Sequence, residues 1–209
     1  MSLRRKTGIG IAVVVFTVVT AHQVRSQLDP GDEGDFQKRT TFIRTSMAPL
    51  DRYVAHWRVT ERHYNDKGEM VATVKGLEEI LWVLDTNAIY RRYNTSSDVS
   101  TYKAIGLLTF NNNSKSFRGV WFDNVSPTGP MNVDAKWDES SLTMVYRSNG
   151  TTKDGKEVEY LKVEKFADEE NRTATTYVVE GDVKRKVLEV HYKRAEACPG
   201  STAIRVIDG

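Results

Sequence analysis

The sequence predicts an all-β protein, an antiparallel up-and-down barrel of about ten strands preceded by a short helix. Segments rich in β-branched and aromatic residues recur along the chain, and turn signals such as NDKG, NNNSK and SPTGP separate them. Helical periodicity is almost absent after residue 55. Short strands joined by hairpins at this spacing are typical of a barrel, with a β-sandwich as the alternative.

Composition indicates one soluble globular domain with a leader or tail. The chain has 209 residues, of which 39% are apolar and 28% are charged. The net charge of +2 comes from 30 basic and 28 acidic residues that are interleaved along the chain. A nucleic-acid-binding surface needs a one-sided basic field, so we expect no nucleic-acid partner.

The N-terminus resembles an export signal. Three basic residues, Arg4 to Lys6, precede an uncharged run that ends at Ala21. The strongly apolar part is shorter than the roughly 20 residues that span a bilayer. We therefore expect residues 1–26 to be a signal peptide, or else an uncleaved signal anchor. The protein is then exported, periplasmic or secreted, and contacts the membrane only through this segment. Residues 27–45 are polar and contain Pro and Gly, which is typical of a linker.

The elements follow in order within a barrel domain at 46–195, and residues 196–209 form a C-terminal tail. A helix is expected at 46–55, with Ser46 as its cap and Pro49 in its first turn. The expected strands are 56–64, 69–85, 89–94, 101–110, 116–124, 131–137, 142–148, 157–167, 174–180 and 184–193.

Alternation along the strands predicts which face is buried. In 184–193 the apolar residues Leu188, Val190 and Tyr192 share one face, and charged residues occupy the other. In 157–167 both faces are mixed, which indicates a strand near a rim or edge. Outward Lys and Glu side chains exclude an outer-membrane barrel, whose lipid-facing positions must be apolar.

The segment FRGVWFDN places Trp121 and Asp123 on one face of a strand. We expect Trp121 to point into the barrel, with Gly119 leaving room for it. Asp123 ends the strand, where a carboxylate can accept backbone N–H groups of the following turn. A ligand-binding or catalytic carboxylate is the alternative for Asp123.

Three stretches resemble one bacterial family, the domain of unknown function 1579: LDRYVAHWRV (50–59), EILWVLDTNAIYRRY (79–93) and AIGLLTFNNNSKSFRGVWFDNVS (104–126). The resemblance covers about 46–195 and implies a lipocalin-like barrel of the calycin group, which includes lipocalins, fatty-acid-binding proteins and nitrobindins. The positions that match the family pattern are Trp82, Leu84, Phe110, Trp121, Asp123, Glu189, Val190, Tyr192 and Arg194. The chain departs from it where Asp85, Thr86 and Asn87 stand in place of Gly-Gly-Arg, and where Asn111 replaces an Asp. The resemblance implies no settled activity.

A closed barrel of this size can enclose side chains or one small ligand. Glu61 and His63 alternate inward with Trp57 along the first strand, so they are either polar anchors in an apolar cavity or wetted residues at its rim. The full set of candidate ligand-binding residues is Trp57, Glu61, His63, Trp82, Phe110, Trp121, Asp123 and Tyr192.

The sequence indicates no cofactor, no metal site and no assigned catalytic residue. The single cysteine, Cys198, cannot form an intrachain disulfide, and no Cys/His cluster has zinc-ligand spacing. Catalytic fingerprints such as the P-loop are missing from the sequence. His191 invites comparison with the haem ligand of nitrobindins, but alternation sends it outward. Glu78 and Glu79 point to opposite faces, and we expect one of them in solvent.

The main functional hypothesis is therefore a binding module that holds a small apolar or amphipathic ligand inside the barrel. One alternative is an envelope structural or interaction domain with a filled core, marked by an exposed apolar patch. A second is an enzyme that uses Glu61, His63 and Asp123 as acid/base groups. A haem-binding, nitrobindin-like protein is the third.

Overall fold

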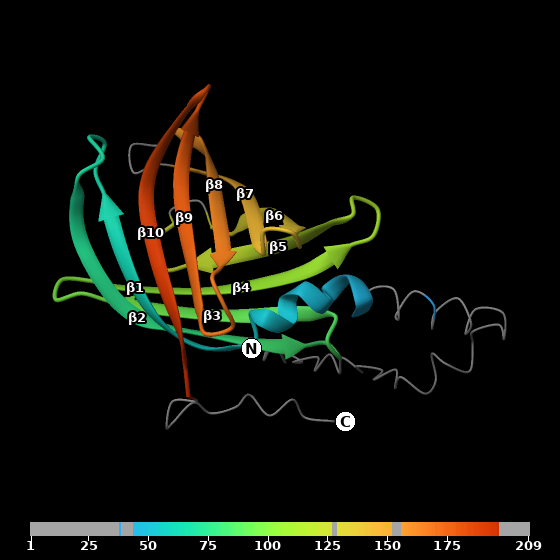
Figure 1. The fold of residues 1–209 in the computed structure, drawn as a ribbon. Helices are drawn as coiled ribbons and strands as arrows, with labels where there is room; N and C mark the ends of the chain where they lie inside the picture. The colour runs from blue at the N-terminus through green and yellow to red at the C-terminus, as the bar shows by residue number, and fades with distance from the viewer. Residues whose placement is uncertain (1–37, 39–43, 127–128, 152–155, 197–209) are drawn as a thin grey trace, which may run out of the picture. The chain divides into compact units, whose positions relative to one another are not determined.

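The structure is a computed structural model, and it describes residues 38, 44–126, 129–151 and 156–196. Within the unit formed by residues 41–209, ten antiparallel strands close into one barrel, and each strand pairs with its neighbours in sequence (Figure 1). The strands are β1 (Ala55–Tyr64), β2 (Met70–Val83), β3 (Ala88–Ser96), β4 (Thr101–Asn111), β5 (Ser116–Asp123), β6 (Met131–Asp138), β7 (Thr143–Thr151), β8 (Glu157–Phe166), β9 (Asn171–Glu180) and β10 (Val183–Ala195). The predicted all-β barrel is confirmed.

Pairing of the first strand with the last closes the barrel. β1 pairs with β10 from His56 opposite Ala195 to His63 opposite Leu188. This pairing leaves neither terminal strand with an open edge, so the sandwich alternative is wrong. The interpretation of 157–167 as an edge or rim strand is also wrong, because β8 pairs along its length with both β7 and β9. Its mixed faces have another cause: charged side chains lie inside the barrel.

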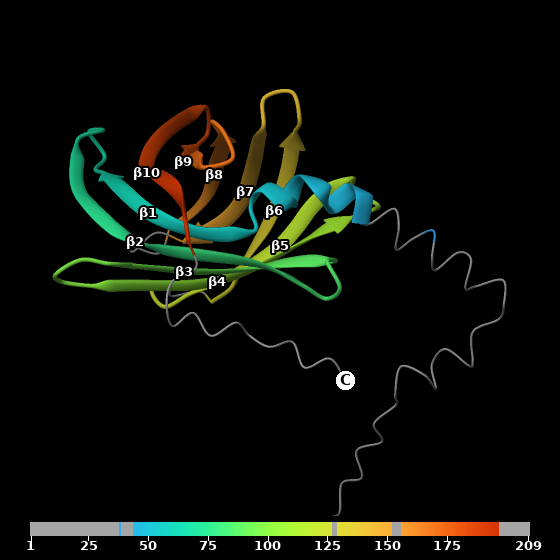
Figure 2. The ribbon, with the colours of Figure 1, turned by 60° about the horizontal axis from the view of Figure 1, so that its bottom comes forward.

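A short helical segment precedes β1. Residues 44–47 are helical, and the 3-10 helix η1 (Ala48–Arg52) continues them. The segment therefore begins within the expected linker and ends before residue 55, because Ala55 already belongs to β1. Met47, Leu50 and Tyr53 are buried, and Figure 2 shows the segment against one end of the barrel (Figure 2).

The inner face of the barrel follows the predicted alternation. In β10, Val190 and Tyr192 are buried, whereas His191 between them is exposed. Residues paired directly across antiparallel strands share a face, so the register identifies the inner positions of every strand.

The turn between β2 and β3 carries local backbone strain. Leu84, Asp85 and Thr86 follow one another with φ of 53°, 52° and 68°. The left-handed region costs an ordinary residue about 1–2 kcal/mol and is least suited to a β-branched side chain. Asp tolerates this region better than Thr, so the strain is greatest at Thr86.

We predict that Thr86→Gly stabilises the protein by about 0.5–1 kcal/mol, because relief of strain exceeds the added backbone entropy of glycine. Asp85→Gly is the matched control and should give a smaller gain. Urea unfolding of both variants and the wild type measures the difference. A Thr86→Gly variant that is less stable than the wild type would contradict this account of the turn.

The leader at 1–26, Cys198 and all but Glu196 of the tail lie outside the described residues. Among the residues that are described, no helix is long and apolar enough to cross a membrane.

Candidate functional site

One end of the barrel is filled and will be called the closed end. It contains the helical segment and an aromatic cluster around Phe166. The β2–β3 turn lies at the same end, because the start of β1 pairs with the last part of β2. The Phe166 ring makes edge contacts with Tyr53 at 4.8 Å and with Trp57 at 6.2 Å between centroids. Trp57 Nε1 donates a hydrogen bond of 2.9 Å to the Tyr53 carbonyl, which attaches the helical segment to the first strand.

Next to the closed end lies a layer of buried charge. Arg91 donates from Nε to Glu78 Oε1 at 2.8 Å and from Nη2 to Glu164 Oε1 at 3.1 Å. Arg172 lies opposite, with Nη1 3.2 Å from Glu164 Oε2 and Nη2 hydrogen-bonded to Glu78 Oε2. The four side chains form a closed ring in which each charge contacts two of opposite sign. We call Glu78, Arg91, Glu164 and Arg172 the charged ring.

Aromatic side chains complete the surroundings of the charged ring. The Tyr146 hydroxyl donates to Glu164 Oε2 at 2.9 Å and accepts from Arg91 Nη1 at 3.3 Å. The Arg172 guanidinium lies 3.8 Å from the Tyr192 ring centroid and 4.7 Å from that of Trp57. Such stacking stabilises a desolvated guanidinium. Desolvation raises the pKa of Tyr192 well above its ordinary value, so its hydroxyl stays neutral.

A fifth charge, Lys162, joins the ring from β8. Its Nζ lies 2.6 Å from Glu164 Oε1. Burial alone would raise the pKa of Glu164, but the positive charges of Arg91, Lys162 and Arg172 outweigh it and hold that pKa well below its ordinary value. Glu164 is therefore an ionised carboxylate throughout the neutral range.

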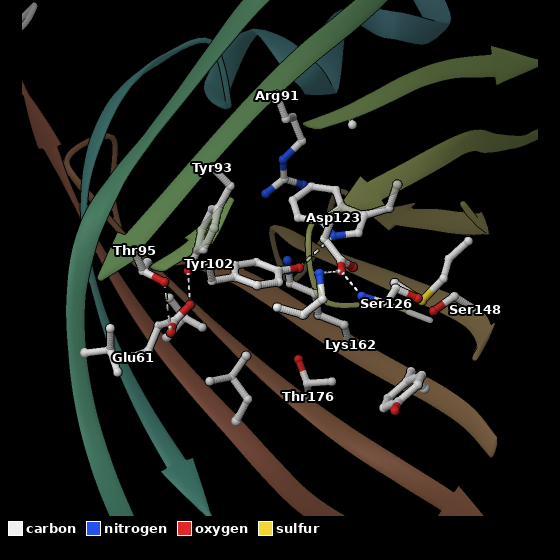
Figure 3. Close-up of a pocket in the computed structure, with 18 of the residues that line it drawn as sticks. Glu61, Arg91, Tyr93, Thr95, Tyr102, Asp123, Ser126, Ser148, Lys162 and Thr176 are labelled. Carbon is white, nitrogen blue, oxygen red and sulfur yellow. Dashed lines mark hydrogen bonds between the residues drawn. The ribbon is translucent and has the colours of Figure 1, made fainter. Parts of the chain in front are cut away.

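Beyond the charged ring the barrel is hollow. A cavity of about 1160 Å³ extends to the opposite end, which is bordered by residues of the β1–β2, β3–β4 and β5–β6 ends and will be called the open end (Figure 3). Its floor is formed by Arg91, Tyr146, Lys162 and Tyr192. Apolar groups dominate the remaining walls; they include Val74, Leu108, Trp121, Met131, Val133, Leu188 and Val190.

One wall of the cavity carries Glu61, which is only 4% exposed. It accepts hydrogen bonds from the Tyr93 hydroxyl at 2.6 Å and from the Thr95 hydroxyl at 3.5 Å, and His63 Nε2 lies 2.9 Å away. Figure 3 shows Tyr93 and Thr95 directed at this carboxylate. The carboxylate is thus satisfied by the protein itself.

Trp121 and Asp123 occupy the facing wall. The Trp121 indole donates to the Tyr102 hydroxyl at 3.0 Å. Asp123 Oδ1 accepts the backbone N–H groups of Val125 at 2.9 Å and Ser126 at 2.6 Å, so its predicted structural role at the strand end is confirmed. The glycine that faces the indole is Gly106 rather than Gly119: a Cβ on Gly106 would lie 2.7 Å from Trp121 Cε3.

The structure divides the eight candidate residues between the two halves of the barrel. Those that line the cavity are Glu61, His63, Trp121, Asp123 and Tyr192. The cavity lining does not include Trp57, Trp82 or Phe110, which pack in or against the core at the closed end. All eight lie on inward-facing positions, so the alternation of residues identified the inner face of each strand correctly. Alternation does not tell how far along the barrel axis a side chain lies.

Sequence reasoning missed most of the polar floor. Arg91 lies in IYRRYN and Lys162 in EVEYLKVEKF, and both occupy inward positions of strands with charges on both faces. The sequence signal that could have revealed these residues was the mixture of apolar and charged residues on both faces of 157–167. It marks buried charge here, because Lys162 and Glu164 on β8 face their partners across the interior.

Two expectations about single residues are also settled. His191 points outward, as alternation predicted, and its Nε2 lies 2.8 Å from Glu189 Oε1. The expectation that one of Glu78 and Glu79 lies in solvent is wrong. Glu78 is in the charged ring, and Glu79 on the outer face is covered by ion pairs with His56 at 3.0 Å and Arg92 at 2.7 Å.

In the described part of the chain, no group of three or more His, Cys, Asp or Glu side chains could hold a metal ion.

We predict that Glu164→Gln lowers the free energy of unfolding by about 3–5 kcal/mol near neutral pH, because it leaves buried cations uncompensated. Since the pKa of Glu164 is lowered on folding, its contribution is present above the ordinary value of 4.5 and is lost as pH falls through the folded-state value. The difference between variant and wild type should therefore shrink in acid. Urea unfolding at several pH values measures it.

The matched control is Glu159→Gln on the same strand, whose partner Arg147 has a side chain 59% exposed. Exposed ion pairs contribute about 0–1 kcal/mol, so this substitution should lower the free energy of unfolding only slightly. An equal loss of unfolding free energy in the two variants would show that the charged ring is not the buried network described.

Comparison with known proteins identifies a family to which this chain is similar. No curated protein is detectably similar in sequence. An S-type phycobiliprotein lyase from Guillardia theta has a structure that aligns over 75% of this chain and 99% of its own, with 12% identity and a TM-score of 0.49. The model of the family described as "Protein of unknown function (DUF1579)" matches residues 45–194. The chain therefore belongs to the DUF1579 family.

Proposed function

We propose that this protein binds a small apolar or amphipathic molecule in the interior of its barrel. The observation that supports the proposal best is the cavity of about 1160 Å³ between the charged ring and the open end. Ligand pockets typically measure about 300–1,000 Å³ and combine apolar walls with a few placed polar groups. This cavity has that composition and is large enough for a molecule of drug size.

The hollow interior weakens the alternative of a domain with a filled core. Exposed apolar side chains do lie on the outer face of β2, β4 and β5, namely Leu77, Ile105, Leu107 and Phe122. The cavity, in contrast, combines apolar walls with a polar floor, which is the composition of a ligand site.

The acid/base alternative is supported only in part. Glu61 and His63 are in contact at 2.9 Å. Asp123, the third member of that hypothesis, already accepts two backbone N–H groups at the open end. The hydrogen bonds to Glu61 from Tyr93 and Thr95 also use acceptor capacity that a general base would offer to a substrate. Interior binding therefore explains more of the site than catalysis does.

Export is part of the proposal, and it rests on the basic and apolar residues of the leader. An exported barrel would hold its ligand outside the cytoplasm. Native mass spectrometry of the protein purified from its own host tests both points, since it reports the N-terminal residue and any co-purifying molecule.

We predict that a bulky side chain placed inside the cavity weakens binding. Ser148 lines it, so Ser148→Trp should weaken binding of the uncharged probe dodecanol by about tenfold or more, which corresponds to 1.4 kcal/mol. Isothermal titration calorimetry measures the affinity, and urea unfolding shows whether the variant is folded. Arg147→Trp places the same side chain on the outer face and should bind as the wild type does.

Failure of the wild type to bind dodecanol or any other apolar probe would count against interior binding. Unchanged affinity in a folded Ser148→Trp variant would place the ligand elsewhere, for example on the outer apolar face.

A further inference from the structure

We propose that the ligand carries a single anionic group at its inner end, and that Lys162 at the floor of the cavity binds this group. The inference rests on the proposed function and adds the chemical class and the orientation of the ligand. It is based on the charged side chains that face the cavity.

Lys162 is the charge at the floor that a ligand can reach. Its side chain is 26% exposed, against 5% for Arg91 and 0% for Arg172. The ammonium has three N–H donors. Among the described residues, its Nζ lies 2.6 Å from Glu164 Oε1 and 5.4 Å from the centroid of the Tyr146 ring, so donors remain for a ligand.

The charges around the floor do not balance. Three cations, Arg91, Lys162 and Arg172, surround two anions, Glu78 and Glu164. Buried charge is stable when it is paired, so this group has one uncompensated positive charge. Burial lowers the pKa of Lys162, and its attraction to Glu164 only partly opposes that effect. One bound anion would supply the missing compensation.

The acidic residues of the cavity argue against a cationic ligand. Glu61 is almost fully covered and accepts from Tyr93 and Thr95. Asp123 is held by the N–H groups of Val125 and Ser126. Both carboxylates therefore accept hydrogen bonds from the protein, whereas the Lys162 ammonium has N–H donors beyond the one that faces Glu164. Glu61 lies on β1 and Lys162 on β8, which are not neighbouring strands, so an anion at the lysine need not contact the glutamate.

The walls of the cavity indicate the chemistry of the rest of the ligand. From the floor to the open end the cavity is bordered mainly by aliphatic and aromatic side chains, which suit an apolar chain or ring system. A monoanion such as a carboxylate matches the single excess charge. A second negative charge would lack a partner in the interior and would bind more weakly.

The test compares dodecanoate with dodecanol, two probes of the same chain length that differ in charge. Calorimetry is carried out on the wild type, on Lys162→Met and on Lys165→Met. Lys165 lies three residues further along β8 and is exposed, so it is the matched control. We expect the wild type and Lys165→Met to prefer dodecanoate by about tenfold to a hundredfold, as for a charge-assisted hydrogen bond. Lys162→Met should lose this preference and still bind dodecanol.

A second measurement uses only the wild type, in case Lys162→Met does not fold. In bound dodecanoate labelled with ¹³C at its carboxyl group, the NMR shift should report a pKa lower than that of the free acid, because an ammonium lies beside it. An unchanged or raised pKa would overturn the inference. Equal affinity of the wild type for both probes would also overturn it and leave the proposed function intact. If neither probe binds, the proposed function itself fails.

Discussion

The constraint on which the rest of the structure depends is the mutual compensation of four buried charges. Glu164 remains ionised inside the barrel because the guanidinium groups of Arg91 and Arg172 lie beside it, and the same two groups contact Glu78. The ring links the neighbouring strands β2 and β3 to the neighbouring strands β8 and β9 across the interior of the barrel. It thereby separates a closed end packed with aromatic side chains from a hollow end that a ligand can enter.

This division also explains how the barrel can be both stable and hollow. At the closed end the helical segment and Phe166 supply close packing, so the other half does not need a filled core. The charged ring then provides a polar floor with Lys162 at its surface, while Trp121 and the aliphatic wall residues provide apolar surface above it. The cavity follows from the unequal use of the two halves of the barrel.

The fold could be predicted from the sequence because the alternation of apolar and polar residues and the hairpin turns are local signals, and the strand bounds depend on them. The role of Asp123 followed from its position at the end of a strand, whereas the same local signals left a sandwich open as the alternative to a closed barrel. The height of a side chain along the barrel could not be predicted, since it depends on the register between strands; Trp57 and Trp121 both point inward but lie in different halves. The charged ring was missed for a related reason. Glu78 and Arg172 are 94 residues apart in the sequence, and only the closed barrel brings them together.

The central claim is that the cavity binds an amphipathic molecule with its charged end on the floor. The most direct measurement is a crystal structure of the protein with ω-bromododecanoate, in which anomalous scattering locates the bromine atom and the electron density locates the carboxylate. The account predicts a carboxylate within hydrogen-bond distance of Lys162 Nζ and a bromine atom toward the open end. A bromine atom at the floor, or a probe bound only on the outer face, would contradict it.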